Sequence, residues 1–156
     1  MGSKFFLIKN KVKNFKKNLR VDGDKSISIR WLLLASQAIG VSKAKNLPMS
    51  EDVLSAINCL KKLGIKIKLS NQNCIKYGRG INGFKYKKNL ILNAGNSGTF
   101  ARLILGLLVK SPYYIKLIGD KSLSKRDFER VISPLQKVGA NFKVNNQKTL
   151  PLKIIG

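Results

Sequence analysis

The spacing of apolar residues predicts four helices separated by short strands. Residues 28–39 are apolar on nearly every side and predict a buried helix that Gly40 stops. Residues 51–63, behind Ser50 as the predicted cap, carry apolar side chains at helical spacing. These side chains are Val53, Ile57, Leu60 and Leu63. Strands are predicted where short apolar or alternating runs lie between turn residues, at 41–47, 65–69 and 74–77.

The same order of elements recurs in the second half of the chain. Helices are predicted at 99–109 and 127–138, and strands at 90–92, 113–118, 141–144 and 152–155. Arg30 has a counterpart in Arg102, and Gly64 has one in Gly139 at nearly the same separation. We therefore predict an α/β fold that repeats one βαβαββ unit.

The predicted units span residues 23–84 and 85–156, and an N-terminal segment precedes them. In that segment, residues 1–22, the apolar run 5–8 predicts a strand followed by a basic connector. This run is too short for the core of a signal peptide, and the longest apolar stretches, 31–35 and 103–109, are too short to span a membrane. We expect a soluble cytoplasmic protein that does not insert into a membrane.

The composition predicts negatively charged partners. The chain has 31 Lys and Arg residues against 7 Asp and Glu residues, a formal charge of +24. Nucleic acid, a membrane surface and small phosphorylated metabolites all fit this charge. Part of the lysine excess accompanies Asn and Ile, as an A+T-rich coding sequence would produce, so the charge alone does not choose among these partners.

Several kinds of chemistry are excluded by the residues that the chain lacks. It has no histidine, which rules out His-dependent triads and His-ligated metals. Cys59 and Cys74 are too few and too far apart for a disulfide framework or a zinc knuckle, and we expect both to be inert. No metal site is predicted.

Three loops ahead of predicted helices carry the candidate chemistry. DKSISIR (24–30) and GNSGTFAR (95–102) each lead into an apolar helix that has an arginine near its start. Free N–H groups, the helix dipole and a guanidinium group favour an anion at such a place. In the third loop, GDKSLSKRD (119–127), the spacing of Ser124 and Asp127 predicts a capping box, with Ser124 as the N-cap and Arg126 in the first helical turn.

Together, these three loops resemble successive motifs of the 5-enolpyruvylshikimate-3-phosphate (EPSP) synthase family. The resemblance runs from about residue 21 to residue 140. It implies the enolpyruvyl transferase fold, an inside-out α/β barrel-like arrangement in which each of two domains repeats the βαβαββ unit three times. The related UDP-N-acetylglucosamine enolpyruvyl transferase is an alternative that these motifs favour less, and a basic nucleic-acid-binding protein is a more distant one.

The resemblance implies transfer of the enolpyruvyl group of phosphoenolpyruvate to the 5-hydroxyl of shikimate 3-phosphate. This reaction needs no cofactor and is catalysed by positioning and electrostatics. The positions that match the family's contacts to shikimate 3-phosphate are Lys25, Ser26 and Arg30. Those that match its contacts to phosphoenolpyruvate are Lys25, Asn96, Gly98, Thr99 and Arg126. Arg102 also matches a family arginine, for which a structural salt bridge and a ligand contact are equally good roles.

Three residues depart from the family's pattern. Asp22 and Asp127 stand where prolines are usual, and Ile29 replaces a common histidine. Asp127 matters most, because its carboxylate is next to Arg126. It is either an acid at a helix start, which the dipole favours, or a group that weakens anion binding.

The family's enzymes are much longer than this chain, so we expect an N-terminal fragment that is inactive alone. The third unit, the second domain and the acid–base residues would then lie outside it, and residues 1–22 would pack with the second domain. Full-length members of the family are usually monomeric.

Overall fold

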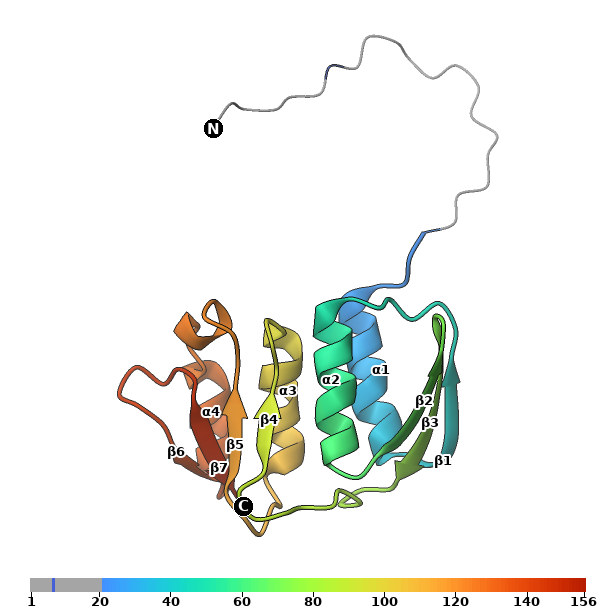
Figure 1. Cartoon of the computed structure of the whole chain (residues 1–156). Coiled ribbons are helices and arrows are strands. Elements are labelled where there is room, and N and C mark those ends of the chain that lie inside the picture. Colours follow the sequence, from blue (N-terminus) through green and yellow to red (C-terminus); the bar gives the residue numbers. More distant parts are fainter. Residues whose placement is uncertain (1–6, 8–20) are drawn as a thin grey trace.

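The computed structural model describes Leu7 and residues 21–156 (Figure 1). These residues form four α-helices, one short 3₁₀ helix and two β-sheets. The α/β class predicted from the pattern of the chain is therefore confirmed. The strand expected at 5–8 lies outside the described residues, apart from Leu7.

The first half of the fold packs two helices against a three-stranded sheet. Its elements are α1 (Lys25–Gln37), β1 (Ile39–Ala44), α2 (Glu51–Lys62), β2 (Lys66–Ser70) and β3 (Asn73–Arg79). The strand order is β1-β3-β2, and both pairings are antiparallel.

The second half has a four-stranded mixed sheet. Its elements are β4 (Ile91–Asn93), α3 (Gly98–Leu108), β5 (Ile115–Ile118), the 3₁₀ helix η1 (Leu123–Lys125), α4 (Glu129–Lys137), β6 (Asn141–Lys143) and β7 (Leu152–Ile155). The order is β4-β5-β7-β6, with β4 and β5 parallel and the other pairs antiparallel. The segment β5-β7-β6 has the same order and directions as β1-β3-β2 in the first half.

Helices α1, α2 and α3 stand side by side between the two sheets (Figure 1). Their facing apolar side chains form one continuous core through both halves, in which Leu32, Ile57 and Phe100 are almost wholly buried. Burial of this apolar surface is the main force that holds the two halves together.

Helix α1 differs from its prediction in its start and in its burial. It begins at Lys25 because the carboxylate of Asp24 accepts the N–H of Ile27 at 2.6 Å and caps the first turn. It is also not buried on every side, since Ile27 is 68% and Leu34 72% exposed. The helix ends at Gln37, and Gly40 belongs to strand β1 instead of stopping the helix.

Candidate anion-binding site

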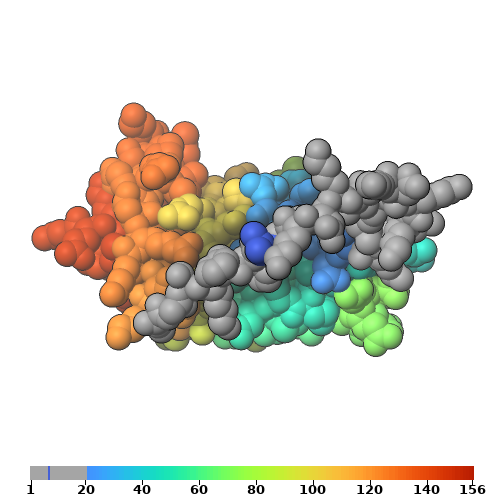
Figure 2. Space-filling model, turned by 90° about the horizontal axis from the view of Figure 1, so that it is seen from above, coloured from blue at the N-terminus to red at the C-terminus, as the bar shows by residue number. Residues whose placement is uncertain are grey.

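The starts of α1, α2 and α3 and the loop after β5 lie at the same end of the molecule (Figure 1). Seen from above, parts of the blue, teal, yellow and orange segments share this face (Figure 2). Because β4 and β5 are parallel, the loops at their carboxyl ends leave the same edge of the sheet. The three predicted loops are therefore brought to one end of the fold.

The loop before α3 is shaped by Gly95 and Ser97. Gly95 has a φ of +57°, and a Cβ there would lie 2.7 Å from Oγ of Ser55 on α2. Ser97 is the N-cap of α3, and its hydroxyl accepts the N–H of Phe100. Within residues 21–156, the N–H groups of Asn96 and Thr99 have no acceptor in the protein, so this loop offers two backbone donors to a ligand.

Arg126 lies over Gly98, at the start of α3. A Cβ at position 98 would be 2.9 Å from Nη1 of Arg126 and 3.2 Å from Nη1 of Arg102. Nη2 of Arg126 also donates to Oδ1 of Asn96 at 3.3 Å. Three of the predicted residues, Asn96, Gly98 and Arg126, therefore meet at one place.

The predicted capping box at Ser124 is wrong. Residues 123–125 form the short helix η1, Arg126 is extended at φ −83° and ψ 140°, and α4 begins only at Glu129. Oδ1 of Asp127 accepts the N–H of Glu129 at 2.8 Å. Asp127 is thus an acid at a helix start, and Arg126 lies before the helix, in a turn that directs it toward Gly98.

Arg102 makes two contacts with the segment before α4. Its Nη2 donates to the backbone oxygen of Asp127 at 3.1 Å, and its guanidinium carbon lies 5.2 Å from the centre of the Phe128 ring. These contacts tie α3 to the segment before α4. The partner is a carbonyl oxygen, so this contact is a hydrogen bond and not a salt bridge, which is one of the two roles considered for Arg102.

Lys25 lies in the first turn of α1 and forms an ion pair across to α2. Its Nζ is 2.7 Å from Oδ2 of Asp52. Asp52 is one helical turn before Ser55, the residue against which Gly95 packs. The start of α2 therefore connects Lys25 with the loop before α3.

Ser26 and Arg30 are neighbours on α1, as their spacing predicts. Nη1 of Arg30 donates to the backbone oxygen of Ser26 at 3.1 Å. The same arginine borders an apolar groove of about 260 Å³ between α1 and α3. The other lining residues are Leu33, Leu34, Leu103 and Leu107.

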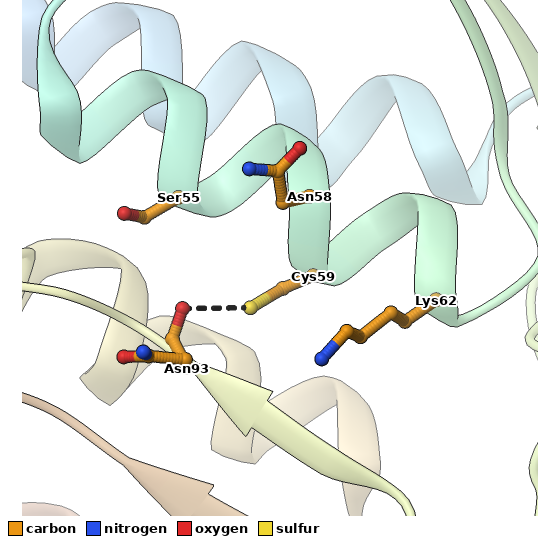
Figure 3. Close-up of a pocket in the computed structure, with 5 residues that line it drawn as sticks. All are labelled: Ser55, Asn58, Cys59, Lys62 and Asn93. Carbon is orange, nitrogen blue, oxygen red and sulfur yellow. Dashed lines mark hydrogen bonds between the residues drawn. The ribbon is translucent and has the colours of Figure 1, made fainter.

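A second hollow, of about 400 Å³, lies between α2 and β4 (Figure 3). Sγ of Cys59 donates to the backbone oxygen of Asn93 at 3.2 Å, and Nζ of Lys62 donates to that of Ile91 at 3.0 Å. Burial raises the pKa of the Cys59 thiol to about 11. The thiol therefore stays protonated at neutral pH and is not an activated nucleophile.

The contacts of two polar residues, Asp120 and Lys76, were not predicted from the sequence. Asp120 is exposed, and the N–H of Leu123 and the amide of Asn96 lower the pKa of its carboxyl group. Lys76 is fully buried on β3, where its ammonium group donates to the backbone oxygen of Leu32, and burial lowers its pKa to about 7. Asp120 could have been noticed because it directly follows Gly119 in one of the three loops. Nothing in the sequence distinguishes Lys76 from the other lysines of the chain.

Backbone donors at a helix start, with guanidinium groups beside them, are typical of sites that bind anions. The chain is thus an α/β protein with a candidate site of that kind. Comparison with known proteins gives the family. The model of the EPSP synthase (3-phosphoshikimate 1-carboxyvinyltransferase) family matches residues 9–156. The chain belongs to this family.

Individual relatives agree with this assignment. The chain is 45% identical over 139 residues to the 3-phosphoshikimate 1-carboxyvinyltransferase of Oenococcus oeni, with 89% of this chain and 32% of that protein covered. It is 48% identical over 138 residues to that of Ruthia magnifica, covering 88% of this chain and 31% of that protein. The solved EPSP synthase of Acinetobacter baumannii superimposes with a TM-score of 0.82 at 33% identity, over 88% of this chain and 32% of that one. The chain thus spans about a third of the length of these relatives.

Proposed function

We propose that this chain forms part of an enzyme that transfers the enolpyruvyl group of phosphoenolpyruvate to shikimate 3-phosphate. The observation that carries the proposal is the meeting of Arg126 with Gly98 and Asn96 at the start of α3. This constellation lies in a chain whose relatives are named for that reaction. The guanidinium of Arg126 lies over a glycine, beside backbone N–H groups that have no acceptor within residues 21–156, and such an arrangement can bind a phosphate or a carboxylate.

Phosphoenolpyruvate is the ligand that we assign to the loop before α3. Asn96, Gly98, Thr99 and Arg126 would hold it, and Lys25 would reach it from α1. Its phosphate and carboxylate need several donors at once, which a guanidinium fork and two N–H groups supply. These groups would neutralise the ligand and fix its orientation, the positioning that an addition reaction between two bound substrates requires.

Shikimate 3-phosphate is assigned to the first turns of α1. Lys25, Ser26 and Arg30 lie there, and the contact of Arg30 with the backbone of Ser26 keeps its guanidinium beside that turn. Lys25 is shared between the two proposed ligands. Its ammonium has three N–H donors, so it can keep its contact with Asp52 while it donates to a phosphate.

We further propose that the two halves are two repeated units of a larger domain: β4 to β7 form a βαβαββ unit, and α1 to β3 form the last five elements of another. The matching orders of β1-β3-β2 and β5-β7-β6 support this reading, and so does the apolar groove between α1 and α3. Leu34 is 72% and Leu103 41% exposed there, although their neighbours along the same helices are core residues. The groups that move protons in the reaction would belong to the part of the family's length that this chain does not span. A cytoplasmic location remains a prediction that accompanies this proposal.

Calorimetric titration tests the proposed function. The chain is titrated with shikimate 3-phosphate, inorganic phosphate and UDP-N-acetylglucosamine in turn. We expect shikimate 3-phosphate to bind more tightly than the other two, because it is the only one of the three that offers both a phosphate and a carboxylate to the hydrogen-bond donors of the site. Preference for UDP-N-acetylglucosamine would favour the related transferase. An oligonucleotide is titrated in the same way, and tight binding with a steep dependence on salt would favour a nucleic-acid-binding protein instead.

A further inference from the structure

Asp120 connects the loop before α3 with the turn that leads to Arg126. It follows β5 after Gly119, beside the parallel strand β4. Its N–H donates to the backbone oxygen of Gly95 at 2.9 Å. Asp120 is therefore bonded through its backbone to the loop before α3, and it is itself part of the loop that follows β5.

The side chain of Asp120 makes a contact in each direction. Oδ1 accepts the N–H of Leu123 at 2.7 Å and so caps η1, the turn before Arg126. Oδ2 accepts Nδ2 of Asn96 at 2.6 Å. One carboxylate thus holds both segments that carry the proposed ligand contacts.

These contacts determine which way the Asn96 amide faces. A carboxylate only accepts hydrogen bonds, so Asn96 must turn its NH₂ group toward Asp120. Its carbonyl oxygen Oδ1 then faces Nη2 of Arg126, at 3.3 Å. In the reversed orientation, the NH₂ group would face the guanidinium, and two donors would oppose one another.

We propose that Asp120 is a positioning residue of the anion site, which orients the amide of Asn96 and, through it, the guanidinium of Arg126 over Gly98. This inference rests on the proposed function, because it takes phosphoenolpyruvate as the ligand that Arg126 binds. Asp120 itself does not contact that ligand.

The proposal predicts an effect opposite to that of simple electrostatics. Asp120 is a negative charge close to a site for anions, so Coulomb repulsion alone predicts that its removal strengthens binding. Positioning predicts that its removal weakens binding, because Asn96 becomes free to reverse and Arg126 loses its acceptor. The direction of the change therefore distinguishes the two effects.

The first experiment titrates phosphoenolpyruvate into the chain and into the variants Asp120→Asn and Asp127→Asn. Asp127→Asn is the matched control, since it removes a carboxylate next to Arg126 that has no contact with Asn96. We expect Asp120→Asn to weaken binding about fivefold to tenfold, the size of a lost hydrogen bond. Asp127→Asn should not weaken binding. Equal or tighter binding by Asp120→Asn would overturn the proposal.

The second experiment needs no ligand and follows the side-chain amide signals of Asn96 by ¹⁵N NMR during an acid titration. In the unaltered chain, these signals should shift as Asp120 is protonated, and the shift should be absent in Asp120→Asn. Signals that are the same in both proteins would contradict the proposal. If the unaltered chain binds no phosphoenolpyruvate, the proposed function fails, while this measurement still decides whether Asp120 orients Asn96.

A double-substitution cycle separates the amide from the turn. In an Asn96→Ala background, Asp120 keeps its contact with Leu123 but has no amide to orient. We expect Asp120→Asn to cause no further loss of binding in that background. A further loss as large as in the unaltered chain would show that Asp120 acts through the turn alone, and the proposal would be wrong.

Discussion

The ammonium group of Lys25 lies 2.7 Å from Oδ2 of Asp52, which joins the start of α1 to the start of α2. The side chain of Asp52 is 15% exposed and that of Lys25 is 52% exposed. The more buried acid therefore anchors the lysine, whose ammonium group remains accessible to an anion. The chain has only 7 Asp and Glu residues, and one of them, Asp52, forms this ion pair.

Lys25→Ala should weaken binding of shikimate 3-phosphate by roughly 1.5 to 3 kcal/mol, because a charge-assisted contact is lost. Lys68→Ala is the control, since Lys68 is an exposed residue of β2 and should cost less than about 1 kcal/mol. Calorimetric titration of both variants gives the comparison. Equal losses would show that the overall charge, and not this site, attracts the anion.

Gly98→Ala should reduce affinity for phosphoenolpyruvate about tenfold and leave the fold intact. The added Cβ would lie 2.9 Å from Nη1 of Arg126, so the flexible guanidinium has to move from its position over the helix start. Binding and thermal unfolding are measured on the same samples. A Gly98→Ala protein that binds as the unaltered chain does would count against the assignment of this loop.

Gly106→Ala, in the same helix, provides the matched control for that substitution. Gly106 is exposed, and a Cβ there meets nothing within 4 Å. Alanine in a helix interior should therefore raise the free energy of unfolding by about 0.5 to 1 kcal/mol and leave binding unchanged. Denaturant titration measures the gain.

The contribution of Lys76 to stability should rise with pH from about 7 upward. Burial lowers the pKa of its ammonium group from 10.5 to about 7, so above pH 7 the unfolded chain holds a proton that the folded chain has released. The free energy of unfolding should increase by up to about 2 kcal/mol between pH 7 and pH 9 and be insensitive to this group below that range.

Lys76→Met isolates that effect from the many exposed lysines. The variant removes the buried titratable group and keeps a long apolar side chain under α1. Urea denaturation at pH 6.5, 8 and 9 should show that the free energy of unfolding of the unaltered chain, minus that of the variant, rises with pH, because the burial that raises the pKa values of Cys59 and Cys74 affects both proteins alike. Parallel profiles would mean that another group causes the pH dependence.

The 156-residue polypeptide by itself should not release phosphate from phosphoenolpyruvate and shikimate 3-phosphate at an enzyme-like rate. The chain covers 32% of the length of these relatives, and under the proposed function the groups that transfer protons and the part that excludes water would belong to the remaining length. Phosphate release with both substrates present is the measurement. A rate on the order of 10 per second would be incompatible with this prediction.

Local patterns were sufficient for much of the secondary structure. The helix expected at 51–63 is observed at Glu51–Lys62, and the one expected at 99–109 is observed at Gly98–Leu108. In the first, apolar residues recur on one face over several turns, and the second is apolar along most of its length; patterns of that length depend little on context. The loops that resemble the family's motifs could also be found, because their residues are adjacent in the chain.

Tertiary packing decided the burial of individual side chains. In β3, alternation favours Ile75 and Tyr77 as the core face, yet Cys74 and Lys76 are the buried residues. The carbonyl oxygen of Leu32 on α1 makes burial of Lys76 possible by accepting its hydrogen bond, and no local pattern of the chain contains that acceptor.

The sequence and the tertiary structure each determined part of the candidate site. The amino-acid sequence by itself made Asn96, Gly98 and Arg126 candidates, because each lies in a loop that resembles a motif of the family. The start of α4 follows the contact of Asp127 with Glu129, and the carboxylate of Asp120 reaches both loops only because β4 and β5 pair in parallel. Residues far apart in the chain meet through strand pairing, and hydrogen bonds of about 3 Å then select one arrangement of their side chains, which is why this part of the site belongs to the tertiary structure.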